Sequence, residues 1–342
     1  MKLTSDKKNL RIAIIGAGSW GTAVAMNLSI NKHDVIMWTH EADVVRDINE
    51  NHKNSDYLPD IDLSHYISST SNPDDLNDCD LFVLAVPTKF IREVMTKHNF
   101  PINGKLIVNL SKGIENKTLM RISEILRDTI GMHLEQYVIL AGPSHAEEVA
   151  KNMPTTVVAA SLIYQNSKFI QEVFSTPSFR VYSSEDVTGC EIGGAVKNVI
   201  ALAAGVLDGL GMGDNTKAAL MTRGLAEMLR LGVLLGANPL TFSGLSGLGD
   251  LIATCSSQHS RNRYVGEQIG KGKSLKEILS EMKMIAEGVN SAESIYHLFK
   301  SIDADMPIIE RMYAVLFEDQ DPKAAITDLM TRKYQREIRK FR

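Results

Sequence analysis

Short apolar runs alternate with amphipathic segments along the first half of the chain. The runs are nearly continuous in aliphatic and β-branched residues, a pattern typical of parallel strands covered on both faces. We expect strands at 12–15, 35–38, 81–86, 106–109 and 138–141, and we consider 154–160 and 179–182 as further strands. Segments 22–30 and 90–97 have helical spacing. This βαβ rhythm predicts a Rossmann-like, doubly wound sheet.

Beyond about Asp186 the pattern changes to helical spacing throughout. Strand-like runs disappear, and long segments rich in Ala, Leu, Gly and Met follow, such as 218–235. For 342 residues we predict an α/β fold with two domains. These are a dinucleotide-binding, Rossmann-like domain at 1–187 and an all-α, substrate-binding domain at 188–342. Because no linker rich in Pro, Gly or Ser separates them, we expect the domains to pack around a cleft.

A glycine-rich segment, Gly16-Ala-Gly-Ser-Trp-Gly21, follows the first predicted strand and opens a helix. In this context Gly16 allows a tight turn, Gly18 lets the backbone approach a pyrophosphate, and Gly21 lets the helix pack closely on the strand. The helix N-terminus also favours an anion. A glycine turn that binds nothing is the alternative, but the order of strand, loop, helix and strand favours a dinucleotide.

The end of the second predicted strand bears on the choice of cofactor. An acidic residue there would bond the ribose 2′-OH of NAD, whereas a basic one suits the 2′-phosphate of NADP. His40 and Glu41 both follow the strand, so the signal is mixed, and a surface-turn histidine explains His40 equally well. Pro87 follows another strand at the ligand-binding edge. It either shapes the loop against the cofactor or only ends the strand.

One lysine is unusual in the helical half. Segment 192–206 is apolar except for Lys197 and Asn198. A lysine in such a helix extends to solvent, pairs with an anion, or is desolvated. Desolvation lowers a lysine pKa, which suits general acid–base catalysis. From this segment alone, a lysine at the edge of an ordinary helix is the slightly favoured interpretation.

Other polar segments strengthen the catalytic interpretation. Asp250 ends a second glycine-rich segment and is placed to start a helix, with Thr254 one turn on along the same face. A simple N-cap is the alternative for Asp250. Ser-Arg-Asn-Arg at 260–263 suits a phosphate, although charged surface turns are common. Lys112 and Gly142-Pro-Ser144 follow strands at the edge where the first glycine loop lies. Together, these segments point to one cleft.

Composition excludes several classes of protein. The net charge is −4 and the pI is near 6.2, unlike the strongly basic surface of a nucleic-acid binder. The three cysteines are widely spaced and the histidines lack ligand spacing, so we expect no disulfide and no metal, as fits a reducing cytosol. Residues 1–10 lack the apolar core of a signal peptide, and no apolar stretch reaches the roughly 18 residues of a membrane span. The basic end, 331–342, is expected to be a solvated tail.

The ordered motifs resemble the NAD(P)-dependent glycerol-3-phosphate dehydrogenase family of the bacterial soluble type. The resemblance extends from about Leu10 to about Leu329. It rests on GAGSWGTA, WTH, LAVPT, LSKGIE, AGPSHAEEV, GGAVKNVIALAAG, GLSGLGDLIATC, SRNR and AEGV, in the family's order and spacing. GGAVKN together with GLGDL and SRNR is the most specific part. Other β-hydroxyacid dehydrogenases share a Rossmann domain and a catalytic lysine, but not this set.

The resemblance implies reversible reduction of dihydroxyacetone phosphate to sn-glycerol 3-phosphate for glycerophospholipid synthesis, with NADP slightly favoured over NAD. It implies that Lys197 is the catalytic acid/base and that Lys112 helps to stabilise or position the reacting group. The expected cofactor-binding residues are Gly16, Gly18, Ser19, Trp20, Gly21, His40, Pro87, Lys112, Ala146, Arg261, Ile285 and Glu287. The expected substrate-binding residues are Lys112, Gly142, Ser144, Lys197, Asn198, Asp250, Thr254, Ser260, Arg261 and Asn262.

Two alternatives remain from the residues. A related β-hydroxyacid dehydrogenase would bind a carboxylate on the 260–263 segment. A catalytically silent dinucleotide sensor is the other alternative, and the combined presence of Lys197, Asp250 and Arg261 argues against it. We expect a cytoplasmic protein with no nucleic-acid partner, and a homodimer because the helical domain is apolar.

Overall fold

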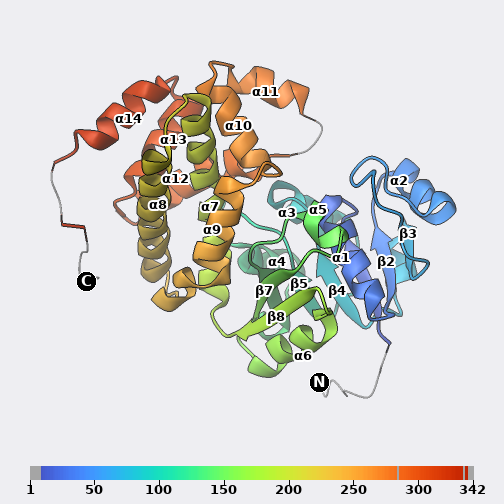
Figure 1. Ribbon diagram of the computed structural model, residues 1–342. Coiled ribbons are helices and arrows are strands. Elements are labelled where there is room, and N and C mark those ends of the chain that lie inside the picture. Colours follow the sequence, from blue (N-terminus) through green and yellow to red (C-terminus); the bar gives the residue numbers. More distant parts are fainter. Residues whose placement is uncertain (1–8, 283–284, 334–335, 338–342) are drawn as a thin grey trace. The chain divides into compact units, whose positions relative to one another are not determined.

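The computed structural model describes residues 9–282, 285–333 and 336–337 (Figure 1). The expectations for residues 1–8, 334–335 and 338–342 therefore lie outside the described residues. The chain divides into two compact units, one formed by 1–112 and 122–187, the other by 113–121 and 188–342. The sequence interpretation assigned 113–121 to the first domain. In the structure, Asn116 donates to Glu293 at 2.5 Å and Arg121 pairs with Glu191 at 3.1 Å, so this segment packs with the helical unit.

The first unit is built on an eight-stranded sheet in the order β3-β2-β1-β4-β5-β6-β7-β8. Its strands are β1 Arg11–Ile15, β2 Asp34–Trp38, β3 Ile67–Thr70, β4 Leu81–Leu84, β5 Leu106–Asn109, β6 Tyr137–Ala141, β7 Thr155–Ala160 and β8 Phe179–Ser184. All neighbouring pairs are parallel except β6 and β7, which are antiparallel. The predicted doubly wound fold is confirmed. The antiparallel pair was not foreseen, because two-sided burial does not reveal strand direction.

The helices of the first unit lie between these strands. They are α1 Ser19–Ile30, α2 Ala42–Arg46, η1 Asp47–Asn51, η2 Pro73–Leu76, α3 Thr88–Lys97, α4 Ile122–Ile130, η3 Leu134–Gln136, α5 Ala146–Ala150 and α6 Tyr164–Phe174. Both faces of the sheet are covered: Ile12 and Ile14 of β1 join a buried cluster with Leu28 of α1, and Ala13 and Ile15, which point the other way, are also buried. This two-sided burial explains the nearly continuous apolar runs.

Buried His33 lies directly before β2, and we expect it to make the stability of this unit sensitive to acid. Its Nδ1 accepts a hydrogen bond from the Leu10 amide at 3.2 Å, and burial lowers its pKa below the ordinary value of 6.5. The folded protein therefore favours neutral His33, and the unfolded chain takes up the proton more readily. The resulting stabilisation is present above pH 6.5 and is lost as the pH falls through the lowered pKa.

We expect His33→Asn, whose amide oxygen can replace Nδ1 as acceptor, to flatten this pH dependence. The measurement is the free energy of unfolding in urea at about pH 7.5 and about pH 5.5. Exposed His65→Asn is the matched control and should retain the wild-type difference. An unchanged difference in His33→Asn would contradict the assignment.

The second unit is helical, as predicted. Its elements are α7 Val187–Gly209, α8 Asp214–Leu234, η4 Pro239–Ser243, η5 Leu245–Gly249, α9 Asp250–Ser256, α10 Arg261–Gly270, α11 Leu275–Glu281, α12 Glu287–Ser301, α13 Pro307–Phe317 and α14 Pro322–Met330. Residues 189–207 of α7 are all buried. In contrast to the sequence interpretation, α7 is long and apolar enough to span a membrane, but its most apolar window is 100% buried within the protein. A helix that is apolar all round is typical of a core position.

Candidate active site

Gly16 and Gly21 hold the end of β1 close to the start of α1. Gly16 has φ +110°, and a Cβ on it would lie 2.7 Å from the carbonyl oxygen of Ala85. A Cβ on Gly21 would collide with the carbonyl oxygen of Gly16. Backbone atoms cannot move aside cheaply, so any larger residue at either position would strain the loop. The sequence-based explanation of these two glycines therefore agrees with the geometry.

Gly18 differs from these two glycines in its surroundings. It is the N-cap of α1, and a Cβ on it would meet no described atom within 4 Å. The first turn of α1 contains no acidic residue that would compete with an anion for the helix N-terminus. Open space beside a glycine at this position is what the close approach of a pyrophosphate requires. The loop therefore fits a dinucleotide.

Ser19 and Trp20, the other predicted cofactor residues of this loop, make protein contacts. The Ser19 hydroxyl donates to the carbonyl oxygen of Tyr57 at 2.7 Å, and Trp20 packs partly buried against the core of the sheet. Tyr57 was not identified from the sequence. No local pattern marks it, because its hydrogen bonds with Ser19 and Glu41 are formed only by the fold.

His40 and Glu41, which gave a mixed sequence signal, differ in their surroundings. The Tyr57 hydroxyl donates to the Glu41 carboxylate at 2.9 and 3.0 Å, and Thr39 donates to it at 3.4 Å. Burial, together with Glu41, raises the pKa of Tyr57 to about 12, so the phenol stays a donor. His40 is exposed. The carboxylate is thus engaged within the protein, whereas the imidazole faces solvent.

Three predicted residues meet beyond β5 and β6. Lys112 Nζ donates to the carbonyl oxygen of Gly142 at 3.2 Å, and the Ser144 hydroxyl donates to the same oxygen at 3.0 Å. Pro87 and Ala146 lie at helix starts of the same unit, since Pro87 is the N-cap of α3 and Ala146 is the first residue of α5. β4 ends at Leu84, earlier than expected, so the backbone has left the sheet before Pro87.

Lys197 is the centre of the polar cluster in the helical unit. Only 5% of its surface is exposed. Its Nζ donates to Thr254 Oγ1 at 2.8 Å and forms a short ion pair with Asp250 Oδ1. The Thr254 hydroxyl donates in turn to the backbone oxygen of Asp250 at 2.6 Å. The edge-lysine interpretation is therefore wrong: Lys197 is buried and paired with a carboxylate.

The second glycine-rich segment serves to bring Asp250 to this lysine. A Cβ on Gly193, one turn before Lys197 on α7, would collide with the carbonyl oxygen of Ser246 in η5. This backbone contact sets η5, and α9 after it, directly against α7. Gly249, not Asp250, is the N-cap of α9, so the N-cap interpretation of Asp250 is wrong and its side chain is engaged by Lys197 instead.

Asn262 links α10 to two other helices, α7 and α12. Its Nδ2 donates to Asn198 Oδ1 at 3.0 Å, and its Oδ1 accepts from the Gly288 amide at 2.9 Å. Gly288 follows Glu287, the first residue of α12, and Ile285 lies half-buried just before that helix. The predicted pair of asparagines is thus brought together beside Lys197 on α7.

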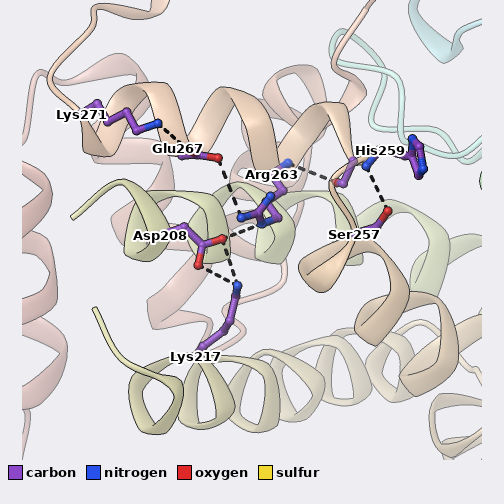
Figure 2. A network of polar contacts seen from close by, with 8 residues as sticks. Asp208, Lys217, Ser257, His259, Arg263, Glu267 and Lys271 are labelled. Atoms are coloured by element: carbon purple, nitrogen blue, oxygen red, sulfur yellow. Dashed lines mark hydrogen bonds and ion pairs between the residues drawn. The ribbon is translucent and has the colours of Figure 1, made fainter. Parts of the chain in front are cut away.

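Ser260 and Arg261 occupy the start of α10. The Ser260 hydroxyl is the N-cap and accepts from the Arg263 amide at 3.2 Å, so its sequence-based role as a phosphate ligand competes with a structural one. Arg261 is exposed. The preceding turn is held by the His259 amide, which donates to Ser257 Oγ at 3.0 Å (Figure 2).

The two units thus offer complementary chemistry. The sheet unit has a glycine loop that fits a dinucleotide, and the helical unit has a buried ammonium held by a carboxylate, which can store and deliver a proton. Burial raises the pKa of the Cys255 thiol of α9 to about 12, so this thiol offers no competing nucleophile. Among the described residues, no three His, Cys, Asp or Glu side chains gather as metal ligands.

Comparisons with known proteins agree with this chemistry. The family model for the NAD-dependent glycerol-3-phosphate dehydrogenase N-terminus matches residues 11–168, and that for the C-terminus matches 186–327. A glycerol-3-phosphate dehydrogenase (NAD(P)+) of Bacillus licheniformis is 51% identical over 326 residues, covering 94% of each chain. One from Salinibacter ruber is 48% identical over 330 residues, covering 95% of this chain and 96% of that protein. The glycerol-3-phosphate dehydrogenase structure from Coxiella burnetii has a TM-score of 0.89 at 35% identity, covering 95% of this chain and 99% of that one.

Proposed function

The chain belongs to the NAD-dependent glycerol-3-phosphate dehydrogenase family, and we propose that it reduces dihydroxyacetone phosphate reversibly to sn-glycerol 3-phosphate with NADPH or NADH. The observation that carries this proposal is the buried Lys197–Asp250 pair on α7 and α9. A silent dinucleotide-binding protein would have no use for a desolvated ion pair, because replacing such a pair by apolar residues is often neutral or stabilising.

The sheet unit holds the dinucleotide in this proposal. When bound, a reduced nicotinamide supplies the hydride that a ketone carbon requires. The pyrophosphate would lie against Gly18 and the first turn of α1, where the loop leaves open space. Exposed His40 suits a 2′-phosphate, while Glu41 is held back by Tyr57, so the loop region accepts NADPH as well as NADH.

Lys197 supplies the proton. As the ketone is reduced, negative charge develops on its oxygen, and the Nζ proton of Lys197 neutralises it. Asp250 and Thr254 fix the orientation of the ammonium group through their hydrogen bonds. In the reverse direction neutral Lys197 removes the hydroxyl proton. General acid–base catalysis of this kind contributes about 10²–10⁴-fold to the rate.

The substrate phosphate is assigned to the start of α10. The guanidinium of Arg261 is exposed and offers paired N–H donors, which match phosphate oxygens. Asn262 is the next residue of the same turn, and its Nδ2 carries a second N–H besides the one that donates to Asn198 Oδ1. The sheet unit contributes Lys112 to the substrate site. Its Nζ donates to the Gly142 carbonyl oxygen, which also accepts from the Ser144 hydroxyl.

Initial rates with competing substrates test this assignment. Dihydroxyacetone phosphate should support rapid oxidation of NADPH, and 2- or 3-oxo carboxylates without a phosphate should not. The reverse outcome would favour the β-hydroxyacid dehydrogenase alternative. Absence of turnover with either class, in the presence of tight NADPH binding, would favour the dinucleotide sensor.

Tyr57→Phe is expected to shift cofactor preference towards NADH. Loss of the hydroxyl releases the Glu41 carboxylate, which then repels a 2′-phosphate near His40. Surface charge interactions are worth about 0.2–1 kcal/mol, so the ratio of kcat/KM for NADPH to that for NADH should fall by a few-fold at most. Exposed Tyr66→Phe is the control. A ratio equal in all three proteins would show that Tyr57 does not restrain Glu41.

Its product, sn-glycerol 3-phosphate, would supply the glycerol backbone for phospholipid synthesis. We propose that it works in the cytoplasm as a homodimer formed by its apolar helical unit. Light scattering of the purified protein tests the dimer, since a monomer at working concentration would contradict it.

A further inference from the structure

A charged cluster outside the proposed catalytic residues connects three helices. Asp208 Oδ2, near the end of α7, accepts from Arg263 Nε of α10 at 2.5 Å, and the same carboxylate holds Lys217 Nζ of α8 at 2.7 and 2.9 Å (Figure 2). The three side chains are 18–23% exposed. Glu267 lies 3.8 Å from Arg263 and also pairs with Lys271. Because these charges are largely removed from solvent, their interactions are screened less than those of surface pairs.

The contact between α7 and α10 is unusually close along its length. A Cβ on Gly205 would collide with the carbonyl oxygen of Arg263, and a Cβ on Gly266 would collide with that of Leu202. The facing glycines are Gly205, Gly209, Gly266 and Gly270. Beside this line, buried Leu202 and Val206 of α7 belong to the same apolar cluster as Val265 and Ile269 of α10. The polar contacts that flank the glycines add directional restraints on how the two helices align.

Two such contacts lie in the first turn of α10. Asn262 bonds to Asn198, and Arg263 bonds to Asp208. Arg263 follows Arg261 by two residues, which is about 200° around a helix, so the two guanidinium groups point to roughly opposite sides. Arg263 thus anchors the first turn of α10 to α7, and Arg261 lies on the opposite side of the same turn.

We propose that Arg263 and Asp208 are positioning residues for the phosphate-binding turn. Their ion pair fixes the first turn of α10 on α7, so that Arg261 and Asn262 hold the substrate phosphate in register with Lys197. This inference rests on the proposed function, because it concerns the substrate of the same site.

Lys217 provides a matched control for this idea. It bonds to the same carboxylate as Arg263, but it lies on α8, which carries none of the proposed substrate residues. Arg263→Met and Lys217→Met each remove one cation from Asp208. If the cluster only supports the fold, the two variants should have the same KM for dihydroxyacetone phosphate as long as both are folded.

Steady-state kinetics of both variants, of Arg263→Lys and of wild type test the proposal. We expect Arg263→Met to raise the KM for dihydroxyacetone phosphate about tenfold, the size expected for loss of a charged hydrogen bond. Its kcat and its KM for NADPH should change less, and inhibition by inorganic phosphate should weaken in parallel. Arg263→Lys should restore part of the affinity. Lys217→Met should stay within about twofold of wild type in KM, and the urea midpoints of both variants show whether each remains folded.

The proposal is overturned if Arg263→Met keeps the wild-type KM, or if Lys217→Met raises the KM as much. Failure of the proposed function looks different, because wild type itself would then not turn over dihydroxyacetone phosphate. In that case the dissociation constant of inorganic phosphate tests the positioning role of Arg263. Weaker phosphate binding by Arg263→Met than by Lys217→Met supports this role, and equal binding contradicts it.

Discussion

Lys197→Met is expected to lower kcat by about 10²–10⁴-fold while the affinity for NADPH stays near normal. The lysine is the only assigned proton donor, and methionine fills a similar volume without a transferable proton. The measurement is the steady-state rate with dihydroxyacetone phosphate, together with NADPH binding followed by nicotinamide fluorescence. Turnover within about threefold of wild type would show that Lys197 is not the acid.

The same substitution leaves Asp250 as a buried charge without its partner, and breaking a buried pair costs about 3–5 kcal/mol. Loss of activity could then reflect loss of the fold. Lys197→Met/Asp250→Asn removes the charge and keeps an amide that can bond to Thr254. This double variant should regain stability in urea but not turnover. Recovery of turnover as well would contradict the catalytic role.

Gly18→Ala and Gly21→Ala are expected to weaken NADPH binding by different routes. At Gly21 the added methyl collides with the Gly16 carbonyl, so both the melting temperature and the NADPH affinity should fall. Overpacking of this kind costs about 1–3 kcal/mol. At Gly18 the methyl meets no described atom within 4 Å, so the melting temperature should fall only by the small cost of alanine at a helix N-cap, while the approach of the pyrophosphate is blocked.

Gly213→Ala is the matched control for Gly18→Ala, because Gly213 is also a helix N-cap with open space around its Cα. It should show the same small loss of stability and retain the wild-type NADPH affinity. Wild-type affinity in Gly18→Ala would remove the glycine loop from the cofactor site. Differential scanning fluorimetry and fluorescence titration separate the two effects.

Periodicity was a good guide to the elements of the sheet because its strands are buried on both faces. β3 was missed: Ile67-Ser-Ser-Thr70 has a single aliphatic residue and gives no apolar run. Its place beside β2 is fixed by parallel pairing, in which Val35 faces Ile67. Such pairing joins distant segments and leaves no local pattern.

The site was predictable where one segment contained the whole signal. In Gly16–Gly21, the spacing of the glycines is enough to predict the turn and the close packing of helix on strand. The partner of Lys197 could be suspected but not established, because Asp250 lies 53 residues further along the chain and reaches the lysine only through the contact of η5 with α7. Tyr57 and Asp208 had no sequence signal, since a tyrosine or aspartate becomes informative only when its hydrogen-bond partners are known.

Isotope transfer is the most direct test of the central claim, that this chain reduces the ketone of dihydroxyacetone phosphate with a reduced nicotinamide and a proton from Lys197. Wild type would be given dihydroxyacetone phosphate and NADPH labelled with deuterium at both C4 positions, and the product would be analysed by NMR. The account predicts sn-glycerol 3-phosphate with one deuterium at C2 for each NADPH oxidised, and negligible product from Lys197→Met over the same time. Oxidation of NADPH without labelled glycerol 3-phosphate, or equal product from the variant, would contradict it.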